Sequence, residues 1–265
     1  MSQIVRGALF DLSGQVALIT GATGGLGRAF ASVFVAYGAS VVLADREQGD
    51  CEALAMDLAV NLTPAQTIFC CGGDLARSDE CQRLIDAALA RYGRIDTLVL
   101  NAGMQGPAGP LTTVSDDDWD AVMALNLKSA WCLSSAALPA MARQGGGSVV
   151  LMSSIAGLRG NGAIGLYGVS KAALAQMARN LAVEWGPKGV RVNSISPGLI
   201  NTPFAQGLIT DPVFMVRRLA ATPLRRVGEP EEVAGVALML ASRAGAFITG
   251  QNLIVDGGTL VSDGS

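Results

Sequence analysis

Tyr167 and Lys171 are the two side chains whose types and spacing suggest chemistry most directly. They lie four residues apart in a segment of helical periodicity, so both project from one helix face. The chain has no histidine, which excludes a Ser-His-Asp triad, a histidine base and a histidine zinc site. Acid-base chemistry near neutral pH must therefore use another group with a shifted pKa. A cation beside a phenol lowers the pKa of the phenol, so Lys171 can activate Tyr167; an ordinary surface pair is the alternative.

A glycine-rich segment follows the first apolar run of the chain. It reads Thr20-Gly21-Ala22-Thr23-Gly24-Gly25-Leu26-Gly27, and a helix is expected to open at Arg28. Such glycines permit a tight turn and bring backbone N–H groups close to a pyrophosphate at the helix N-terminus. The spacing differs from the common G-x-G-x-x-G fingerprint, and a turn that only needs positive φ is the alternative. Its position after a first strand favours phosphate binding.

Asp45 ends the second apolar run, about 20 residues after the glycine loop. A carboxylate there can accept hydrogen bonds from an adenosine ribose and repels a 2′-phosphate, which favours NAD. Arg46 follows and can neutralise such a phosphate, so NADP is the alternative cofactor. A solvated pair of loop charges is the third interpretation.

Seven short apolar runs alternate with helical segments, and each run is expected to be a buried strand. The expected strands are Val16–Thr20, Ser40–Ala44, Thr67–Cys70, Thr97–Leu100, Ser148–Met152, Val190–Ile195 and Asn252–Val255. The expected helices are Arg28–Tyr37, Ser78–Tyr92, Asp117–Arg143, Tyr167–Trp185 and Glu231–Ala241. This alternation predicts an α/β fold: a single-domain, Rossmann-like, doubly wound parallel sheet with helices on both faces.

Glycine and proline mark the boundaries of these elements. Tyr37-Gly38 and Tyr92-Gly93 place glycine where a helix must end. The proline-rich stretch Gly198–Thr222 is long enough to be a substrate lid of irregular or short-helical structure. The pattern continues without a linker, so residues 1–265 are expected to form one NAD(P)-binding domain.

In order and position, these motifs resemble those of the short-chain dehydrogenase/reductase family over nearly the whole chain. The other matching motifs are Asp74, Asn101-Ala102-Gly103, Asn126, Ser153-Ser154 and Pro197-Gly198. Leu100 replaces a common family asparagine, which is expected to alter the adenine-side contacts slightly. Val169 replaces a common small residue and is not expected to touch the catalytic pair.

The resemblance implies a hydride-transfer enzyme in which Tyr167 is the general acid/base and Ser154 hydrogen-bonds the substrate oxygen. Lys171 would lower the pKa of Tyr167 and bind the nicotinamide ribose, and Asn126 would hold a water that relays protons to Lys171. The implied cofactor contacts are Gly21, Thr23, Gly24, Gly25, Leu26, Gly27, Asp45, Arg46, Asp74, Leu75, Asn101, Ala102, Gly103, Tyr167, Lys171, Pro197, Gly198, Ile200 and Thr202. Asp74 would contact adenine and Thr202 the carboxamide. For Asn101 and Asn126, structural hydrogen bonding is the alternative role.

Charge and composition narrow the partners and the compartment. A net charge of −3 and a pI near 5.0 do not favour nucleic acid. The uncharged apolar stretch Ala29–Ala44 is shorter than the roughly 18 apolar residues of a membrane span, and Met1–Phe10 lacks a signal-peptide core. Five cysteines without a C-x-x-C pair favour a reducing compartment. We expect a cytoplasmic protein without a metal, and the resemblance implies a homotetramer.

The substrate pocket is expected to be mostly apolar, which favours a neutral secondary alcohol or ketone. Its expected walls are Ile155, Leu158, Leu166, Leu199, Phe204, Met104 and Gln105, for which core packing is the alternative role. Arg159 can bind an anion or be a solvated loop charge. Three other functions stay open: a 3-oxoacyl thioester reductase using NADPH, a non-catalytic NAD(H)-binding sensor or scaffold, and an isomerase or epimerase.

Overall fold

The apolar runs form one parallel sheet in the computed structural model, which describes residues 8–262. Its strands are β1 Val16–Thr20, β2 Ser40–Asp45, β3 Ile68–Gly72, β4 Thr97–Leu100, β5 Gly147–Met152, β6 Val190–Pro197 and β7 Asn252–Val255. They lie in the order β3-β2-β1-β4-β5-β6-β7, and every neighbouring pair is parallel. The doubly wound sheet predicted from the sequence is thereby confirmed. The two ends of the predicted 1–265 domain, and most of Met1–Phe10, lie outside the described residues.

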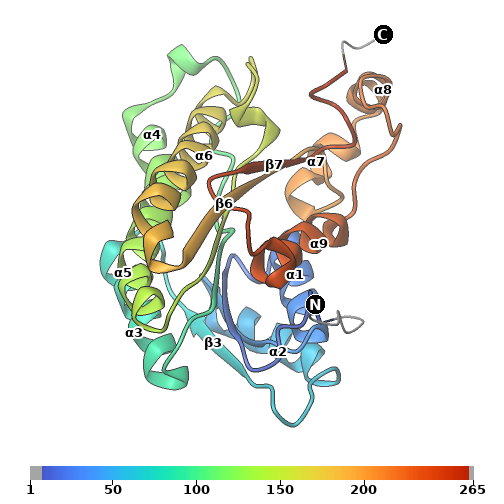
Figure 1. Ribbon diagram of the computed structural model, residues 1–265. Coiled ribbons are helices and arrows are strands. Elements are labelled where there is room, and N and C mark those ends of the chain that lie inside the picture. The colour runs from blue at the N-terminus through green and yellow to red at the C-terminus, as the bar shows by residue number, and fades with distance from the viewer. Residues whose placement is uncertain (1–7, 263–265) are drawn as a thin grey trace.

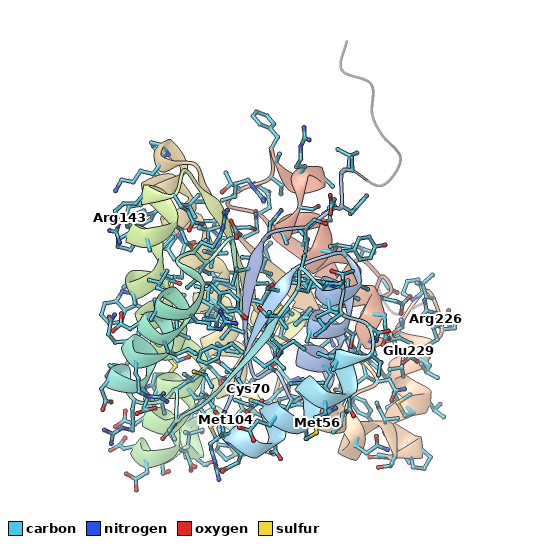
Figure 2. The ribbon with its side chains drawn as sticks, turned by 90° about the horizontal axis from the view of Figure 1, so that it is seen from below. Met56, Cys70, Met104, Arg143, Arg226 and Glu229 are labelled. Atoms are coloured by element: carbon cyan, nitrogen blue, oxygen red, sulfur yellow. The ribbon has the colours of Figure 1, made fainter. Side chains whose placement is uncertain are left out.

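Helices cover both faces of the sheet (Figure 1). One face packs against α1 Gly25–Ala36, α2 Gln48–Ala59 and α9 Pro230–Ala241, and the other against α3 Ser78–Tyr92, α5 Ser129–Arg143 and α6 Gly165–Trp185. Figure 2 shows Arg143 of α5 on one side of the strands and Arg226 and Glu229, which precede α9, on the other. Successive side chains of a strand point to opposite faces of the sheet. Ala17 and Ile19 of β1 therefore belong to one hydrophobic cluster, and Leu18 belongs to the other.

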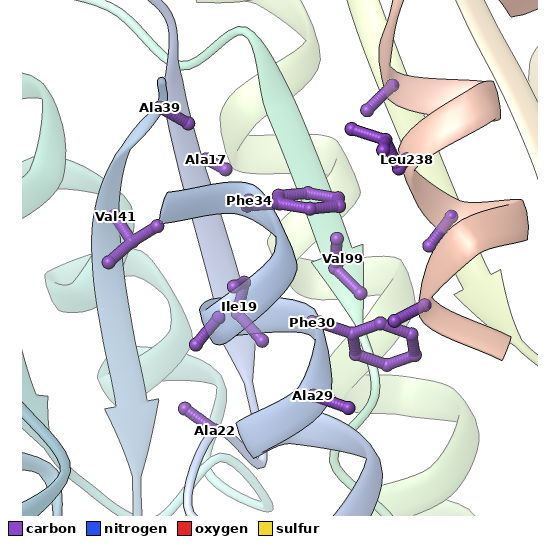
Figure 3. Packing of buried hydrophobic residues seen from close by; sticks show 14 of the residues in the cluster. Ala17, Ile19, Ala22, Ala29, Phe30, Phe34, Ala39, Val41, Val99 and Leu238 are labelled. Carbon is purple, nitrogen blue, oxygen red and sulfur yellow. The ribbon is translucent and has the colours of Figure 1, made fainter. Parts of the chain in front are cut away.

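Two phenylalanines hold α1 against the sheet. Phe30 and Phe34 are fully buried between the strands and Leu238 of α9 (Figure 3). Burying each ring stabilises the fold by about 1.5–3 kcal/mol. This packing places the N-terminus of α1 at the carboxyl ends of the strands. There, β2 and β3 lie on one side of β1 and β4 lies on the other, so the strand order changes direction between β1 and β4.

The helix α2 lies between the second and third strands, where no helix was expected from the sequence. Cys51, Leu54 and Leu58 face the core at spacings of three and four. Met56 and Val60 are apolar yet exposed, and they blur the periodicity that would have revealed the helix.

The expected continuous helix Asp117–Arg143 is in fact three segments. These are α4 Asp116–Met123, a π-helical turn at Ala124–Lys128, and α5. The run Asp116–Arg143 is the one helical stretch in residues 8–262 that is long and apolar enough to cross a membrane. Leu133, Leu138 and Met141 are nonetheless buried against the sheet, as in the core helix of a globular domain. A π-turn inside such a helix often marks a functional position.

Glycines end two helices as predicted, and short helices fill the expected lid. Gly38 has φ +98° just after α1, and Gly93 caps α3 with φ +71°. Residues 198–222 contain a 3₁₀ turn at Pro203–Ala205, then α7 Gln206–Ile209 and α8 Pro212–Ala220. Asp211 caps α8, because its carboxylate accepts hydrogen bonds from the backbone N–H groups of the first turn.

Candidate active site

Hydrogen bonds join the loop after β1 to the loop after β4. The Asn101 amide donates to the carbonyl oxygens of Thr20 (3.1 Å) and Gly21 (3.0 Å). In return, the Thr20 hydroxyl accepts from the backbone N–H groups of Asn101 (3.0 Å) and Ala102 (3.1 Å). Gly21 has φ +62°, and a Cβ there would lie 3.0 Å from the Asn101 amide nitrogen. Asn101 therefore has the structural role that the sequence left as its alternative, beside the expected cofactor position.

The glycines after Gly21 bring the N-terminus of α1 close to two other segments. A Cβ on Gly25 would lie 2.7 Å from the Thr202 side chain, and a Cβ on Gly27 would collide with the Gly21 carbonyl oxygen. Gly24 precedes the helix without a side-chain cap hydrogen bond, so the first N–H groups of α1 have no side-chain partner there. This arrangement fits the pyrophosphate of a dinucleotide, which needs close backbone N–H donors and the positive end of a helix.

Asp45 lies against the glycine loop, as its position at the end of the second strand predicted. One carboxylate oxygen accepts from the backbone N–H (2.9 Å) and hydroxyl (2.7 Å) of Thr23, and the other from the backbone N–H of Arg46 (2.8 Å). The Arg46 guanidinium is exposed and contacts Glu47 at 3.3 Å. Of Asp45 and Arg46, it is therefore the Asp45 carboxylate that is hydrogen-bonded to the glycine loop.

Asp74 and Leu75 follow β3. Asp74 is exposed and accepts from the backbone N–H of Ala76 at 3.0 Å, whereas Leu75 is buried in the core. After β6, Gly198 packs against Asp256, and a Cβ on it would lie 2.8 Å from that residue. Ile200 is buried beyond it and Thr202 reaches Gly25. Most expected cofactor positions therefore lie along one edge of the sheet.

Tyr167 and Lys171 lie on α6 beside the loop after β5. The Lys171 ammonium donates to the carbonyl oxygen of Met152 at 2.7 Å and lies 5.4 Å from the centre of the Tyr167 ring. The Ser154 side chain forms a hydrogen bond with that of Tyr167 and also accepts from the backbone N–H of Ala156 at 3.1 Å. The three side chains named from the family motif are therefore together.

The two neighbouring serines have different roles. Ser153 is buried, and its hydroxyl donates to the carbonyl oxygen of Lys171 at 2.7 Å, which ties β5 to α6. Ser154 is only partly buried and faces Tyr167. Ser154, rather than Ser153, is therefore the serine beside the Tyr167 hydroxyl.

Asn126 lies in the π-turn and joins three segments. Its side chain accepts from the backbone N–H of Met104 (2.8 Å) and donates to the carbonyl oxygen of Met104 (2.8 Å) and to the Ser170 hydroxyl (3.0 Å). The Ser170 hydroxyl in turn donates to the carbonyl oxygen of Tyr167 at 2.8 Å. A Cβ on Gly103 would lie 3.1 Å from Asn126 Oδ1 and 3.3 Å from Lys171 Nζ.

Ser170 was missed by the sequence analysis, because a serine on a helix carries no signal until its partner is known. The contacts with Met104 were missed for the same reason, since they use its backbone. Asn126 also has the structural hydrogen bonds that were its alternative role.

Burial shifts the pKa of both members of the Tyr167 and Lys171 pair. Desolvation raises the pKa of Tyr167 to about 12, against a smaller lowering by the Ser154 hydrogen bond. Desolvation also lowers the pKa of the Lys171 ammonium to about 8. Both groups are therefore protonated at neutral pH in the free protein.

The expected pocket walls separate into two sets. Ile155 and Leu166 are buried core residues, whereas Leu158 and Met104 are exposed. Phe204 belongs to the segment expected to be the lid, and its ring centre lies 6.1 Å from that of Tyr167. Among residues 8–262, no group of three or more Cys, Asp and Glu side chains gathers as a metal site would require.

Comparisons with known proteins agree with this fold and site. Residues 21–259 match the family model described as "Enoyl-(Acyl carrier protein) reductase". Dehydrogenase/reductase SDR family member 4 of Bos taurus is 36% identical over 94% of this chain and 88% of its own length. A tropinone reductase homolog of Arabidopsis thaliana is 35% identical over 96% of this chain and 95% of its own length.

Two solved structures superpose closely on this one. A 7α-hydroxysteroid dehydrogenase complexed with NADH and 7-oxo glycochenodeoxycholic acid has a TM-score of 0.90 and 35% identity, over 96% of this chain and 98% of that one. A Beutenbergia cavernae protein with bound NADP at low occupancy has the same TM-score of 0.90 and 35% identity, over 96% of this chain and 100% of that one.

The chain therefore belongs to the short-chain dehydrogenase/reductase family. It is an NAD(P)-dependent oxidoreductase that acts on hydroxyl or carbonyl groups of small molecules.

Proposed function

We propose that this enzyme interconverts a secondary alcohol and a ketone, prefers NAD, and uses Tyr167 as its general acid/base. The observation that carries the proposal is the cluster of Ser154, Tyr167 and Lys171 beside Asn126, next to a glycine loop shaped for a pyrophosphate. A module that only binds NAD(H) has no need of this cluster, which argues against the sensor or scaffold.

The protein side chains handle the proton. Bound NAD(H) supplies or accepts the hydride at its nicotinamide ring. In reduction, the Tyr167 hydroxyl gives its proton to the substrate oxygen, and the Ser154 hydroxyl stabilises the charge that develops there. The Lys171 ammonium and the positive charge of an oxidised nicotinamide both favour the phenolate, which opposes the desolvation of Tyr167. Asn126 holds a water that passes protons to Lys171.

The cofactor extends along the carboxyl edge of the sheet in this proposal. Its pyrophosphate binds at Gly21, Thr23, Gly24, Gly25, Leu26 and Gly27. Its adenosine reaches Asp45, Arg46, Asp74 and Leu75, and its nicotinamide half reaches Asn101, Ala102, Gly103, Tyr167, Lys171, Pro197, Gly198, Ile200 and Thr202. The position of Asp45 against Thr23 supports NAD, because a 2′-phosphate there would meet a carboxylate.

One structural neighbour supports a ketone as the substrate, whereas the matching family model points to a different substrate class. The hydroxysteroid dehydrogenase was solved with an oxo compound, which is a ketone. The family model's description names a reductase of acyl thioesters, although of their enoyl rather than their 3-oxo group. A 3-oxoacyl thioester reductase using NADPH is therefore kept as the second candidate. We further propose that the protein is a cytoplasmic homotetramer that binds neither nucleic acid nor membrane nor metal.

The test is the absorbance of reduced nicotinamide while purified protein, with NAD and NADP separately, meets secondary alcohols and, in reverse, ketones and acyl thioesters. NAD-dependent turnover of an alcohol supports the proposal. Turnover of only the thioesters with NADPH selects the second candidate, and product without a change in absorbance selects the isomerase. Binding of NADH without turnover of any compound selects the sensor.

A further inference from the structure

A cavity of about 240 Å³ lies beneath the lid, between α8, the segment after β6 and the segment after β7. Leu199 and Ile200 form the wall nearest the nicotinamide positions, and Leu219 and Leu224 add apolar surface. Four charged side chains also line it, namely Arg218, Arg226, Glu232 and Asp256.

Three of these four charged groups have partners within the protein. Arg226 donates to the Glu232 carboxylate at 2.7 Å. The two oxygens of Asp256 accept from the backbone N–H groups of Gly258 and Leu260, each at 2.8 Å. These contacts leave Arg218 as the charged group of the cavity whose side chain has no hydrogen-bonded acceptor among residues 8–262.

Arg218 is half-buried on α8, and its side chain has no hydrogen-bonded partner within residues 8–262. Its Nε is shielded from solvent and unpaired, and no ion pair includes its guanidinium in that part of the chain. A buried donor without a partner costs free energy that a structural role alone does not offset. A ligand that supplies the missing acceptors would remove this cost.

The charges that face Arg218 come from two other segments. Arg159 lies in the loop between Ser154 and Tyr167, and Asp256 follows β7. Burial lowers the pKa of Arg218, the nearby Arg159 lowers it further, and Asp256 raises it. Two guanidinium groups against one carboxylate leave an excess of positive charge near Arg218.

We propose that Arg218, assisted by Arg159, binds the carboxylate of an anionic substrate whose reacting carbon lies at Tyr167. The lid segment that carries Arg218 also carries Phe204, whose ring centre lies 6.1 Å from that of Tyr167, and Arg159 lies in the same loop as Ser154. The inference rests on the proposed alcohol and ketone activity and narrows its substrate to oxo or hydroxy acids with an apolar body. It replaces the neutral substrate expected from the pocket walls.

A phosphate of the cofactor is the other source of anionic oxygens. It would make Arg218 a cofactor-binding residue, so the affinity for NADH distinguishes the two sources. An arginine that holds the substrate carboxylate affects the oxo acid and leaves the dissociation constant of NADH unchanged.

The experiment compares medium-chain oxo acids with their methyl esters, which keep the ketone and lose the charge. We expect kcat/KM to favour the acid in the native enzyme and this preference to fall about 10- to 100-fold in Arg218→Met, mainly through KM. Arg218→Lys should keep part of the preference. Arg217→Met is the matched control, because Arg217 is the exposed neighbour on α8 and should leave the ratio unchanged. The Tm of ligand-free Arg218→Met should be at least that of the native protein, which reports that the variant folds.

Equal kcat/KM of the native enzyme for acid and ester would overturn the proposal. A preference for the acid that persists in Arg218→Met would overturn it too, as would a variant that loses only affinity for NADH. If the enzyme turns over no alcohol or ketone at all, the proposed function fails, and calorimetry of decanoate binding to the NADH complex decides the site. Binding that needs Arg218 then supports an anion site, and no binding contradicts it.

Discussion

Asp45 and Arg46 have opposite effects on the choice of cofactor, and the structure holds the carboxylate nearer the glycine loop. Removing that carboxylate should therefore shift the preference. We expect Asp45→Ala to lower the ratio of kcat/KM for NAD to that for NADP by about 10- to 100-fold, through lost ribose hydrogen bonds and lost repulsion. Asp57→Ala removes an exposed carboxylate that contacts only Arg28, so it is the control. An unchanged ratio would show that Asp45 only supports Thr23.

Lys171 carries a buried charge whose cost depends on pH. Burial lowers its pKa to about 8 from 10.5, so between these values the unfolded chain binds more protons than the native one. The stability contribution of Lys171 therefore improves as pH rises from 8 to 10.5. We expect Lys171→Met to gain stability at pH 7, by at most on the order of 3 kcal/mol, and to lose this advantage near pH 10.

Urea unfolding of both proteins at several pH values measures this difference. Burial raises the pKa of Tyr167 to about 12, and loss of the Lys171 charge can only raise it further, so the native tyrosine stays protonated in both proteins up to pH 10 and its effect largely cancels. A difference that stays constant from pH 7 to pH 10 would mean that the charge of Lys171 is not its cause.

The sequence predicted the family residues but not the polar side chains that orient them. Tyr167, Lys171 and Ser154 follow from motif spacing, and the structure brings them together. The role of Ser170 could not be predicted, because its hydrogen-bond partner, the Asn126 amide, belongs to a segment far away in the sequence. The same holds for Arg218, whose unpaired state depends on the lid and on the segment after β7.

At the level of elements, the glycine loop depends on how closely α1 approaches β1. A Cβ on Gly27 would collide with the Gly21 carbonyl oxygen, whereas a Cβ on Gly235 of α9 would point into open space. We expect Gly27→Ala to destabilise the protein by about 1–3 kcal/mol and to weaken NADH binding. Gly235→Ala should stabilise it by about 0.5–1 kcal/mol. Denaturant midpoints and NADH titration test both, and a harmless Gly27→Ala would contradict the close packing.

Strands and helices with a clear apolar periodicity could be predicted from the sequence. Elements whose apolar pattern is irregular or unmarked could not. The strands follow from buried runs such as Val41 to Leu43, and the structure changes only their ends. Exposed Met56 hid α2, and the π-turn around Asn126 leaves no mark on the apolar pattern of its helix. Both exceptions are cases in which tertiary contacts, rather than local pattern, decide the backbone.

At the scale of the whole molecule, apolar side chains remain exposed on several covering segments. Trp131 of α5 is 54% exposed, Val183 of α6 is 80% exposed, and Phe247 before β7 is fully exposed. Association of copies through these surfaces would bury them. We expect light scattering at micromolar protein to give about four times the 27.1 kDa chain mass. A mass of one chain at that concentration would reject the homotetramer.

The central claim is that Tyr167 moves the proton during hydride transfer. Its most direct test is kcat of Tyr167→Phe on the best substrate, measured with the dissociation constant of NADH. Tyr37→Phe is the control, because Tyr37 lies at the far end of α1 and is exposed. We predict that Tyr167→Phe lowers kcat by at least about 10²–10⁴-fold while NADH binding stays within a few-fold of native. Activity close to that of the native enzyme in Tyr167→Phe would contradict the account.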